Sequence, residues 1–363
     1  SWVGQVSFSS WRRAEAREAE RRAEGRRRFF YWAADGAGLV CPVAPSARRP
    51  HARRGSSASP NKSLQAHPGG RRQAISMATA MLIDATDLER WADRRDSQEV
   101  LPELVRRLVI ATAPRISRAS FRSGEGIQLG GWDGIVEAEQ DNAFVPDGVC
   151  GWELGTSGDV RRKAQEDYEK RSADPKGVDP TRSTFVFVTP RRWAGKDQWI
   201  RERRAEKIWA DVRAYDADDL AAWLVLAPAV HIWISISLGK HPLDALDLHN
   251  FWEDWAATTQ PPATPALVLA GRSEVADRVR DWLRDSSATL RLQAESREEA
   301  LAVFAAAVKL LPEDEQTAYL SRTVIVRSEA AWRQVAAASS PLVLVTDFES
   351  ATAVGHAIRA GHR

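Results

Sequence analysis

Residues 130–171 read GGWDGIVEAEQDNAFVPDGVCGWELGTSGDVRRKAQEDYEKR, and this stretch decides the predicted fold. Turn glycines and alternating apolar residues predict a hairpin strand within residues 127–139. The apolar positions Val149, Trp152 and Leu154 predict a second strand. Asp159 is a plausible N-cap for the basic helix that follows. The stretch therefore predicts acidic residues on a strand-turn-strand unit that leads into a basic helix.

The segments on either side complete an α/β domain, which we place at residues 83–257. Upstream, Thr86 or Asp87 can cap a first helix, and the leucine and valine spacing of residues 97–113 predicts a second. Downstream, the apolar run 183–189 predicts a buried strand. A basic helix, another strand and a helix capped by Asp218 come next. This order predicts a central mixed sheet covered by helices.

A second region follows a Pro/Thr-rich linker at residues 258–265. Residues 266–363 alternate between predicted strands and helices, which favours a parallel, P-loop-like α/β domain. The strands are expected at residues 266–271, 288–294, 322–328 and 341–348. Because the chain ends before such a sheet is finished, we expect a partial domain from a longer protein.

Residues 1–76 are rich in arginine, and their apolar periodicity is weak, which predicts a disordered segment. The chain does not begin with methionine, and the first methionines are Met77 and Met81. We interpret residues 1–76 as not native coding sequence, with translation starting at Met77 or Met81. A basic arm that binds nucleic acid, or a targeting segment, is the alternative.

The bulk composition excludes few functions. The net charge of the 363-residue chain is only +2, so nucleic-acid binding must depend on local patches. No apolar run reaches the ~18 residues that a membrane helix needs. The two cysteines, Cys41 and Cys150, form no metal-ligand spacing and fit a reducing, cytoplasmic compartment.

Asp133 and Glu153 are the candidate metal ligands. Two carboxylates on adjacent strands can share Mg²⁺, which prefers oxygen ligands and keeps several waters. Asp147 is the rival for the first ligand, although an Asp before Gly is most often a turn residue, which is also the plain interpretation of Asp133. Glu153 is harder to assign to a structural role, because glutamate is depleted in strands.

The segments GGWDG, VPDG, WELGT, RRKAQEDYEKR and FVFVTPRRW together resemble the PD-(D/E)XK restriction-endonuclease-like domains that are fused to NTPase modules in bacterial defence proteins. The resemblance implies a metal-dependent DNA endonuclease, with Asp133 and Glu153 as metal ligands. The family's lysine, two positions after the second acid, is replaced by Gly155. Lys163 on the next helix is the candidate to take its place.

Arginines around this site are candidates for contacts with DNA phosphates. The positions are Arg162 on the basic helix and Arg191 and Arg192 after the buried strand. A solvated helix face balanced by glutamates is the alternative interpretation of the basic helix.

The C-terminal region lacks the GxxxxGK[ST] phosphate loop, although Asp347 ends a strand as a Walker-B acid does. This favours a degenerate STAND-like NTPase fold and argues against nucleotide binding. Two hypotheses follow for the whole chain. It is a Mg²⁺-dependent nuclease, or it is a catalytically inactive nuclease-like domain that serves binding or assembly. A homo-oligomer is compatible with both.

Overall fold

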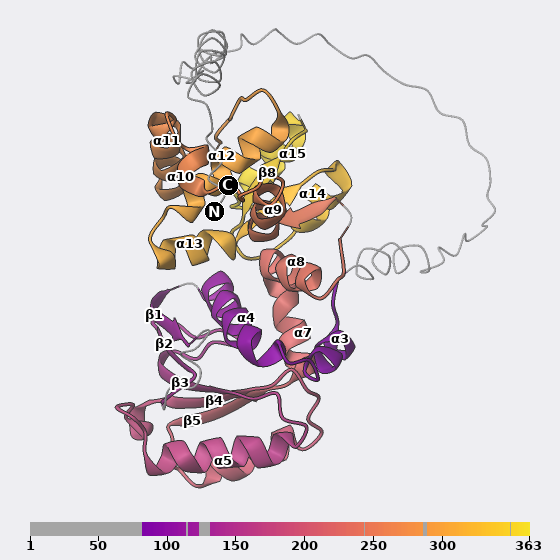
Figure 1. Cartoon of the computed structure of the whole chain (residues 1–363). Coiled ribbons are helices and arrows are strands. Elements are labelled where there is room, and N and C mark those ends of the chain that lie inside the picture. Colours follow the sequence, from indigo (N-terminus) through magenta and orange to yellow (C-terminus); the bar gives the residue numbers. More distant parts are fainter. Residues whose placement is uncertain (1–81, 114, 123–130, 243, 286–288, 349) are drawn as a thin grey trace, which may run out of the picture. The chain divides into compact units, whose positions relative to one another are not determined.

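The computed structural model describes residues 82–363, except residues 114, 123–130, 243, 286–288 and 349 (Figure 1). The Arg-rich segment 1–76 and the expected starts at Met77 and Met81 lie outside the described residues. The chain divides into two compact units, and of the first only residues 291–300 are described. The elements below belong to the second unit, apart from the first turn of helix α12 (Arg297–Lys309).

A five-stranded mixed sheet is the framework of residues 82–256. Its strand order is β1-β2-β3-β4-β5. Strand β2 is antiparallel to both β1 and β3, and β3, β4 and β5 run parallel to one another. The strands are β1 (Ile116–Phe121), β2 (Gly134–Ala138), β3 (Gly148–Leu154), β4 (Thr184–Val188) and β5 (Asp211–Tyr215). The predicted α/β class with a mixed sheet is confirmed.

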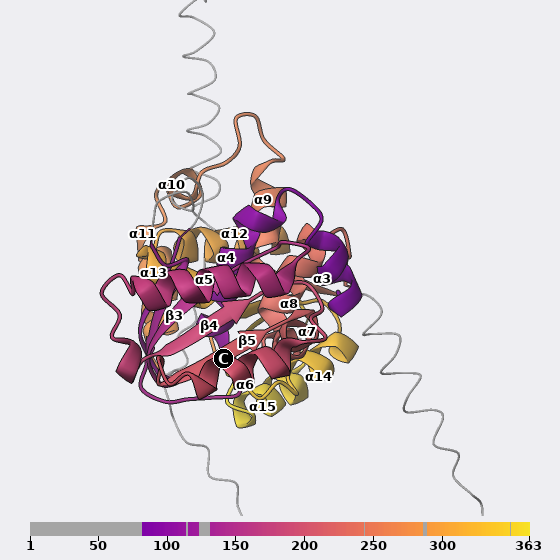
Figure 2. The ribbon, with the colours of Figure 1, turned by 90° about the horizontal axis from the view of Figure 1, so that it is seen from below.

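Helices cover both faces of this sheet, as Figures 1 and 2 show. One face packs on α4 and α7 around a core that includes Trp152, Val186 and Trp223. The other packs on α5 and α6 around Phe185, Phe187 and Trp199. The helices of this region are α3 (Ala85–Trp91), α4 (Ser97–Thr112), α5 (Val160–Ala173), the 3-10 turn η2 (Pro180–Arg182), α6 (Lys196–Ala205), α7 (Ala217–Leu226) and α8 (Pro228–Ser237).

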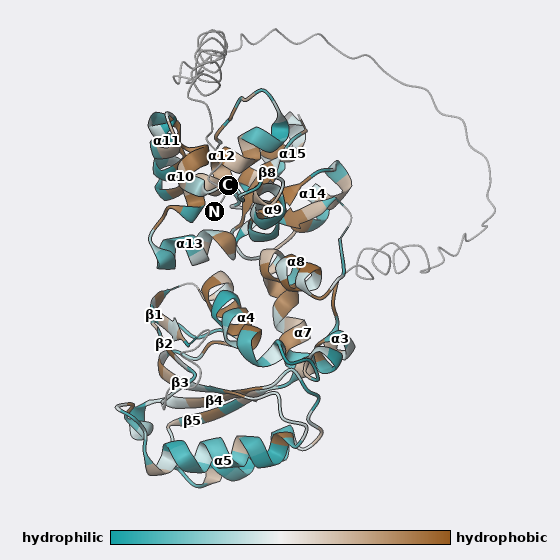
Figure 3. Cartoon of the chain, in the orientation of Figure 1, coloured by the Kyte–Doolittle hydropathy of each residue, from teal (hydrophilic) through white to brown (hydrophobic). Residues whose placement is uncertain are grey.

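Burial follows the expected patterns of strand and helix. Every residue of β4 is buried, because helices lie on both of its faces. Figure 3 shows β4 as hydrophobic and most of α5 as hydrophilic. On α5 only Val160, Ala164, Tyr168 and two charged residues are buried, so one face of a very polar helix meets the sheet.

Aspartates cap several helices, and two of the predicted caps are wrong by two or three positions. Asp84, not Thr86 or Asp87, caps α3, with Asp87 completing a capping box. Asp216, not Asp218, caps α7 in the same way with Asp219. Asp159 caps α5 as predicted, because its side chain accepts from the Arg162 backbone N–H at 3.1 Å.

A smaller three-stranded sheet, in the order β6-β7-β8, lies in the C-terminal part. Strand β6 (Ala245–Asp247) is antiparallel to β7 (Thr323–Val326), which is parallel to β8 (Val343–Thr346). The strands expected within residues 322–328 and 341–348 are thus confirmed, and β6 pairs across the predicted linker. The remaining helices are α9 (Leu248–Ala256), α10 (Pro265–Val268), α11 (Ser273–Arg284), α13 (Glu313–Leu320), α14 (Glu329–Val335) and α15 (Ala351–Arg359).

Two predicted strands of the C-terminal part are wrong. The segment expected to be a strand at residues 266–271 starts with α10, because Thr264 caps a helix that has a proline at its first position. Residues 289–294 are in neither helix nor strand. Among the helices that the structure describes, none has both the length and the apolar character needed to cross a bilayer.

Candidate functional site

Strand pairing brings Asp133 and Glu153 together, as predicted. Gly134 of β2 lies opposite Trp152 of β3, so Asp133, the residue before β2, lies beside the C-terminal end of β3. One carboxylate oxygen of Asp133, Oδ2, accepts a hydrogen bond from the Leu154 backbone N–H at 2.8 Å. This bond holds the half-buried Asp133 side chain toward β3 and next to Glu153.

Glu153 lies in an unusual environment for a carboxylate, because it is buried and paired with a buried arginine. Its Oε1 accepts a hydrogen bond from Nε of Arg171, and the side chains of Glu153 and Arg171 are only 4% and 1% exposed. Burial, and next the charge of Asp133, raise the pKa of Glu153 to about 8, while Arg171 opposes them. The site therefore disfavours the charged form of Glu153, because the carboxyl group lies next to Asp133 where water is excluded.

Arg171 ties the start of β2 to the end of β3. Its Nη2 donates to the carbonyl oxygen of Gly131, and its guanidinium lies 5.0 Å from the centre of the Trp132 ring. That ring lies against Gly151 of β3, where an added Cβ would come within 2.6 Å of it. The Nη1 atom of Arg171 is buried and has no hydrogen-bond partner among the described residues.

Lys163 lies against Gly155, the position from which the expected lysine is missing. A Cβ built on Gly155 would be 3.0 Å from Cγ of Lys163 and 3.1 Å from the ring of Phe187. The lysine side chain thus occupies the space that a side chain at position 155 would take. Its Nζ donates to Oδ1 of Asp167 at 2.7 Å, and the described contacts join it to neither Asp133 nor Glu153.

Asp167 is the site residue that the sequence reasoning missed. It is 5% exposed, and its pKa is raised, first by burial and also by the charge of Asp133. Its second oxygen, Oδ2, is buried without a hydrogen-bond partner in the described structure. Lys163, Asp167 and Arg171 are four residues apart on α5, so helical spacing puts all three on the face that meets Glu153. That spacing is the sequence signal that could have identified Asp167.

The donor atoms of this cluster suit a hard divalent cation, which would take carboxylate oxygens and water. In the described conformation no group of three or more His, Cys, Asp and Glu side chains is arranged to hold a metal ion. Asp133 and Glu153 supply the one or two carboxylates that Mg²⁺ commonly uses, and Asp167 lies close enough to Asp133 for that charge to raise the pKa of Asp167. The residues therefore fit Mg²⁺ chemically, provided that Glu153 exchanges Arg171 for the cation.

Asp147 lies away from this cluster. It is exposed and precedes β3, whereas Glu153 is near the other end of that strand. Gly148 follows it with a φ of 71°, a value that glycine adopts readily, as expected for a turn. This favours the interpretation of Asp147 as a turn residue.

The three arginines expected to contact phosphate differ in their surroundings. Arg162 is 61% exposed and pairs with Glu166 at 2.8 Å on the helix surface. The Nε atom of Arg191 donates to the Thr156 carbonyl at 2.7 Å, and its Nη2 lies 2.8 Å from Asp93. Arg192 is 43% exposed and bridges Glu89 and Asp218. Arg191 thus has a structural role, whereas Arg162 and Arg192 present charge to solvent.

Comparisons with protein-family models, with curated proteins and with solved structures gave no match.

Proposed function

We propose that residues 83–257 form a metal-dependent DNA endonuclease domain of the restriction-endonuclease-like class. The observation that carries the proposal is the contact between Lys163 and Gly155. A lysine side chain lies over the position two residues after Glu153, although it comes from the following helix. A lysine, which this chemistry needs in addition to the metal ion, therefore lies next to the acidic pair.

The order of elements supports the proposal. A helix, three antiparallel strands, a helix and two further parallel strands surround the site in sequence and in space. Asp133 precedes the second strand, and Glu153 is on the third. Two acids on adjacent strands at one end of the sheet are what the family pattern requires.

Each residue then has a defined task. Asp133 and Glu153 would hold Mg²⁺, which would activate water and stabilise the charge of an attacked phosphodiester. Lys163 orients the water and offsets phosphate charge, after exchanging its bond to Asp167 for one to the substrate. Arg162 and Arg192 contact DNA phosphates, which gives affinity without base specificity. We further propose that the domain is a cytoplasmic defence effector joined to a degenerate NTPase-like module.

A catalytically inactive binding or assembly module is the second candidate. The observation in its favour is that both charged pairs are already satisfied within the chain. Arg171 forms an ion pair with Glu153, and Asp167 forms one with Lys163. In this alternative the buried pairs only hold β2, β3 and α5 together.

Plasmid nicking by the full chain in the presence of Mg²⁺ tests the two candidates. The nuclease proposal expects wild-type chain to nick the plasmid, Glu153→Ala to abolish nicking and EDTA to do the same. Glu137→Ala is the matched control, because Glu137 is an exposed carboxylate on β2. Equal nicking by wild type and Glu153→Ala contradicts the proposal, and so does wild-type chain without activity that still binds DNA.

A further inference from the structure

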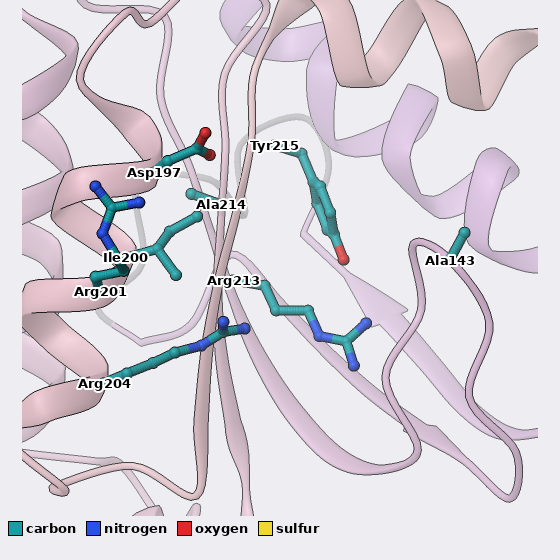
Figure 4. Close-up of a pocket in the computed structure, with 8 residues that line it drawn as sticks. All are labelled: Ala143, Asp197, Ile200, Arg201, Arg204, Arg213, Ala214 and Tyr215. Carbon is teal, nitrogen blue, oxygen red and sulfur yellow. The ribbon is translucent and has the colours of Figure 1, made fainter.

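A pocket of about 350 Å³ lies at the free edge of the five-stranded sheet, away from the acidic cluster. Strand β5 is last in the strand order, so one of its edges has no strand beside it in the described sheet. Figure 4 shows Arg201 and Arg204 reaching from α6 on one side of β5, and Arg213 and Tyr215 on the other side. The pocket therefore wraps around the edge strand, and its volume falls within the range of small-ligand sites.

The charge of this pocket is predominantly positive. Three arginines line it, against the single carboxylate of Asp197. Asp211 holds two of them, because it accepts from Nε of Arg204 at 2.6 Å and from Nε of Arg213 at 3.2 Å. These bonds fix both side chains and leave terminal nitrogens of Arg213 for other acceptors. Arg201 is exposed, and no ion pair within the described chain neutralises it.

Tyr215 provides a second observation that points to a ligand. Its side chain lines the pocket, the residue is 7% exposed, and its buried hydroxyl oxygen interacts with Arg213, while the hydroxyl hydrogen has no acceptor in the described structure. In Figure 4 this hydroxyl points toward the space beside the Arg213 guanidinium. Burial raises the pKa of Tyr215 to about 12, so the phenol is protonated at neutral pH and can donate to an anion.

We propose that this pocket binds a phosphate monoester of nucleotide size. Guanidinium groups bind phosphate oxygens in pairs, so the terminal nitrogens of Arg213 can hold the phosphate. Arg201 and Arg204 add positive charge from the other side of β5. An oxygen placed beside Arg213 also satisfies the Tyr215 hydroxyl. The site uses none of the acidic-cluster residues, so it does not depend on the proposed nuclease activity.

Calorimetric titration of the full chain with adenosine 5′-monophosphate tests the proposal, with adenosine as the uncharged control. Saturable binding of the monophosphate is expected, and none of adenosine. Arg213→Gln should weaken binding about tenfold, the effect of losing one charge-assisted hydrogen bond. Tyr215→Phe should weaken binding by a smaller factor with little change in the melting temperature, because the hydroxyl donates to no acceptor in the described structure. Arg118→Gln is the matched control, since Arg118 is an exposed arginine on β1.

A second pair of ligands identifies the source of the phosphate. A single-stranded oligonucleotide with a 5′-phosphate is compared with the same oligonucleotide carrying a 5′-hydroxyl. Preference for the 5′-phosphate that depends on Arg213 supports the proposal with a nucleic-acid end as the source. Preference for the mononucleotide supports it with a free nucleotide as the source. The proposal is overturned if wild-type chain binds neither phosphate ligand, or if Arg118→Gln weakens binding as much as Arg213→Gln.

Discussion

Arg171 donates from Nε to Oε1 of Glu153, and both side chains are buried between α5 and β3. This ion pair sits where the proposed metal ligand must act, so it bears on both stability and activity. Replacing one partner of a buried ion pair is strongly destabilising, because the other charge stays buried without solvation. Variants of this ion pair can therefore show whether the cluster stabilises the fold or takes part in catalysis.

Replacing Arg171 alone should destabilise the domain strongly. Above about pH 8, where Glu153 is charged, Arg171→Met leaves its carboxylate buried without its partner, and we expect a loss of about 3–5 kcal/mol in the free energy of unfolding. The double variant Arg171→Met, Glu153→Leu should recover much of this loss, because no buried charge remains. Urea denaturation of the three proteins measures the effect. A loss below about 1 kcal/mol in the single variant would show that the pair contributes little.

The stability of the domain should fall as the pH rises toward 8. Burial and Asp133 raise the pKa of Glu153 from 4.5 to about 8, so above pH 4.5 the folded chain holds a proton that the unfolded chain has lost. This contribution is complete below the unfolded pKa and disappears as the pH rises through about 8. Denaturation of wild type and Glu153→Gln between pH 5 and pH 9 should show the slope only in wild type.

Binding of Mg²⁺ should follow the opposite trend with pH. The cation needs the carboxylate form of Glu153, so its affinity rises as the pH approaches and passes about 8. Titration of wild-type chain with Mg²⁺ at several pH values checks this, and Glu153→Gln is the control. An affinity that does not change between pH 6 and pH 9 would refute a ligand role for Glu153.

The proposed nuclease should accept its lysine at either of two sequence positions, 163 or 155. Lys163→Ala removes the side chain that lies over Gly155, and we expect plasmid nicking to fall at least tenfold, the order expected when a group supporting a metal site is lost. Adding Gly155→Lys to that variant restores a lysine in the vacated space, and part of the activity should return. Lys170→Ala, an exposed lysine on the same helix, is the control. Nicking that survives Lys163→Ala unchanged would argue against a catalytic role.

Arg191 and Arg192 should respond differently to removal. Arg191→Ala breaks partly buried bonds to the carbonyls of Thr156 and Ala92, so we expect a loss of about 1–3 kcal/mol in stability. Arg192→Ala should change stability by no more than about 0.5 kcal/mol, because its ion pairs are exposed. Arg192→Ala should instead weaken DNA binding and lower its salt dependence. Urea denaturation and DNA titration at two salt concentrations distinguish these effects.

Local patterns in the sequence were enough to predict the main sheet. The apolar run that became β4 and the alternation that became β2 carry their own burial pattern, since strand periodicity depends on the neighbouring residues alone. Strand β3 does not alternate, because its last five residues are all buried. Helix caps were predicted less well. Several aspartates and threonines lie near the starts of α3 and α7, and only the backbone geometry selects Asp84 and Asp216. The expected strand at residues 266–271 failed because Thr264 and Pro265 favour a helix start over the β propensity of the residues that follow.

The sequence by itself predicted that Asp133 and Glu153 lie close together at neighbouring strands and that Lys163 lies in the first turn of the helix after them. Only the tertiary structure decided which groups meet. It paired Glu153 with Arg171 and Lys163 with Asp167, and it placed Lys163 over Gly155. The reason is that these contacts depend on how α5 packs against β3, in depth and rotation, and strand or helix periodicity specifies neither. Periodicity in the sequence shows which face of a helix or strand is buried, whereas tertiary packing decides which charged side chains form pairs.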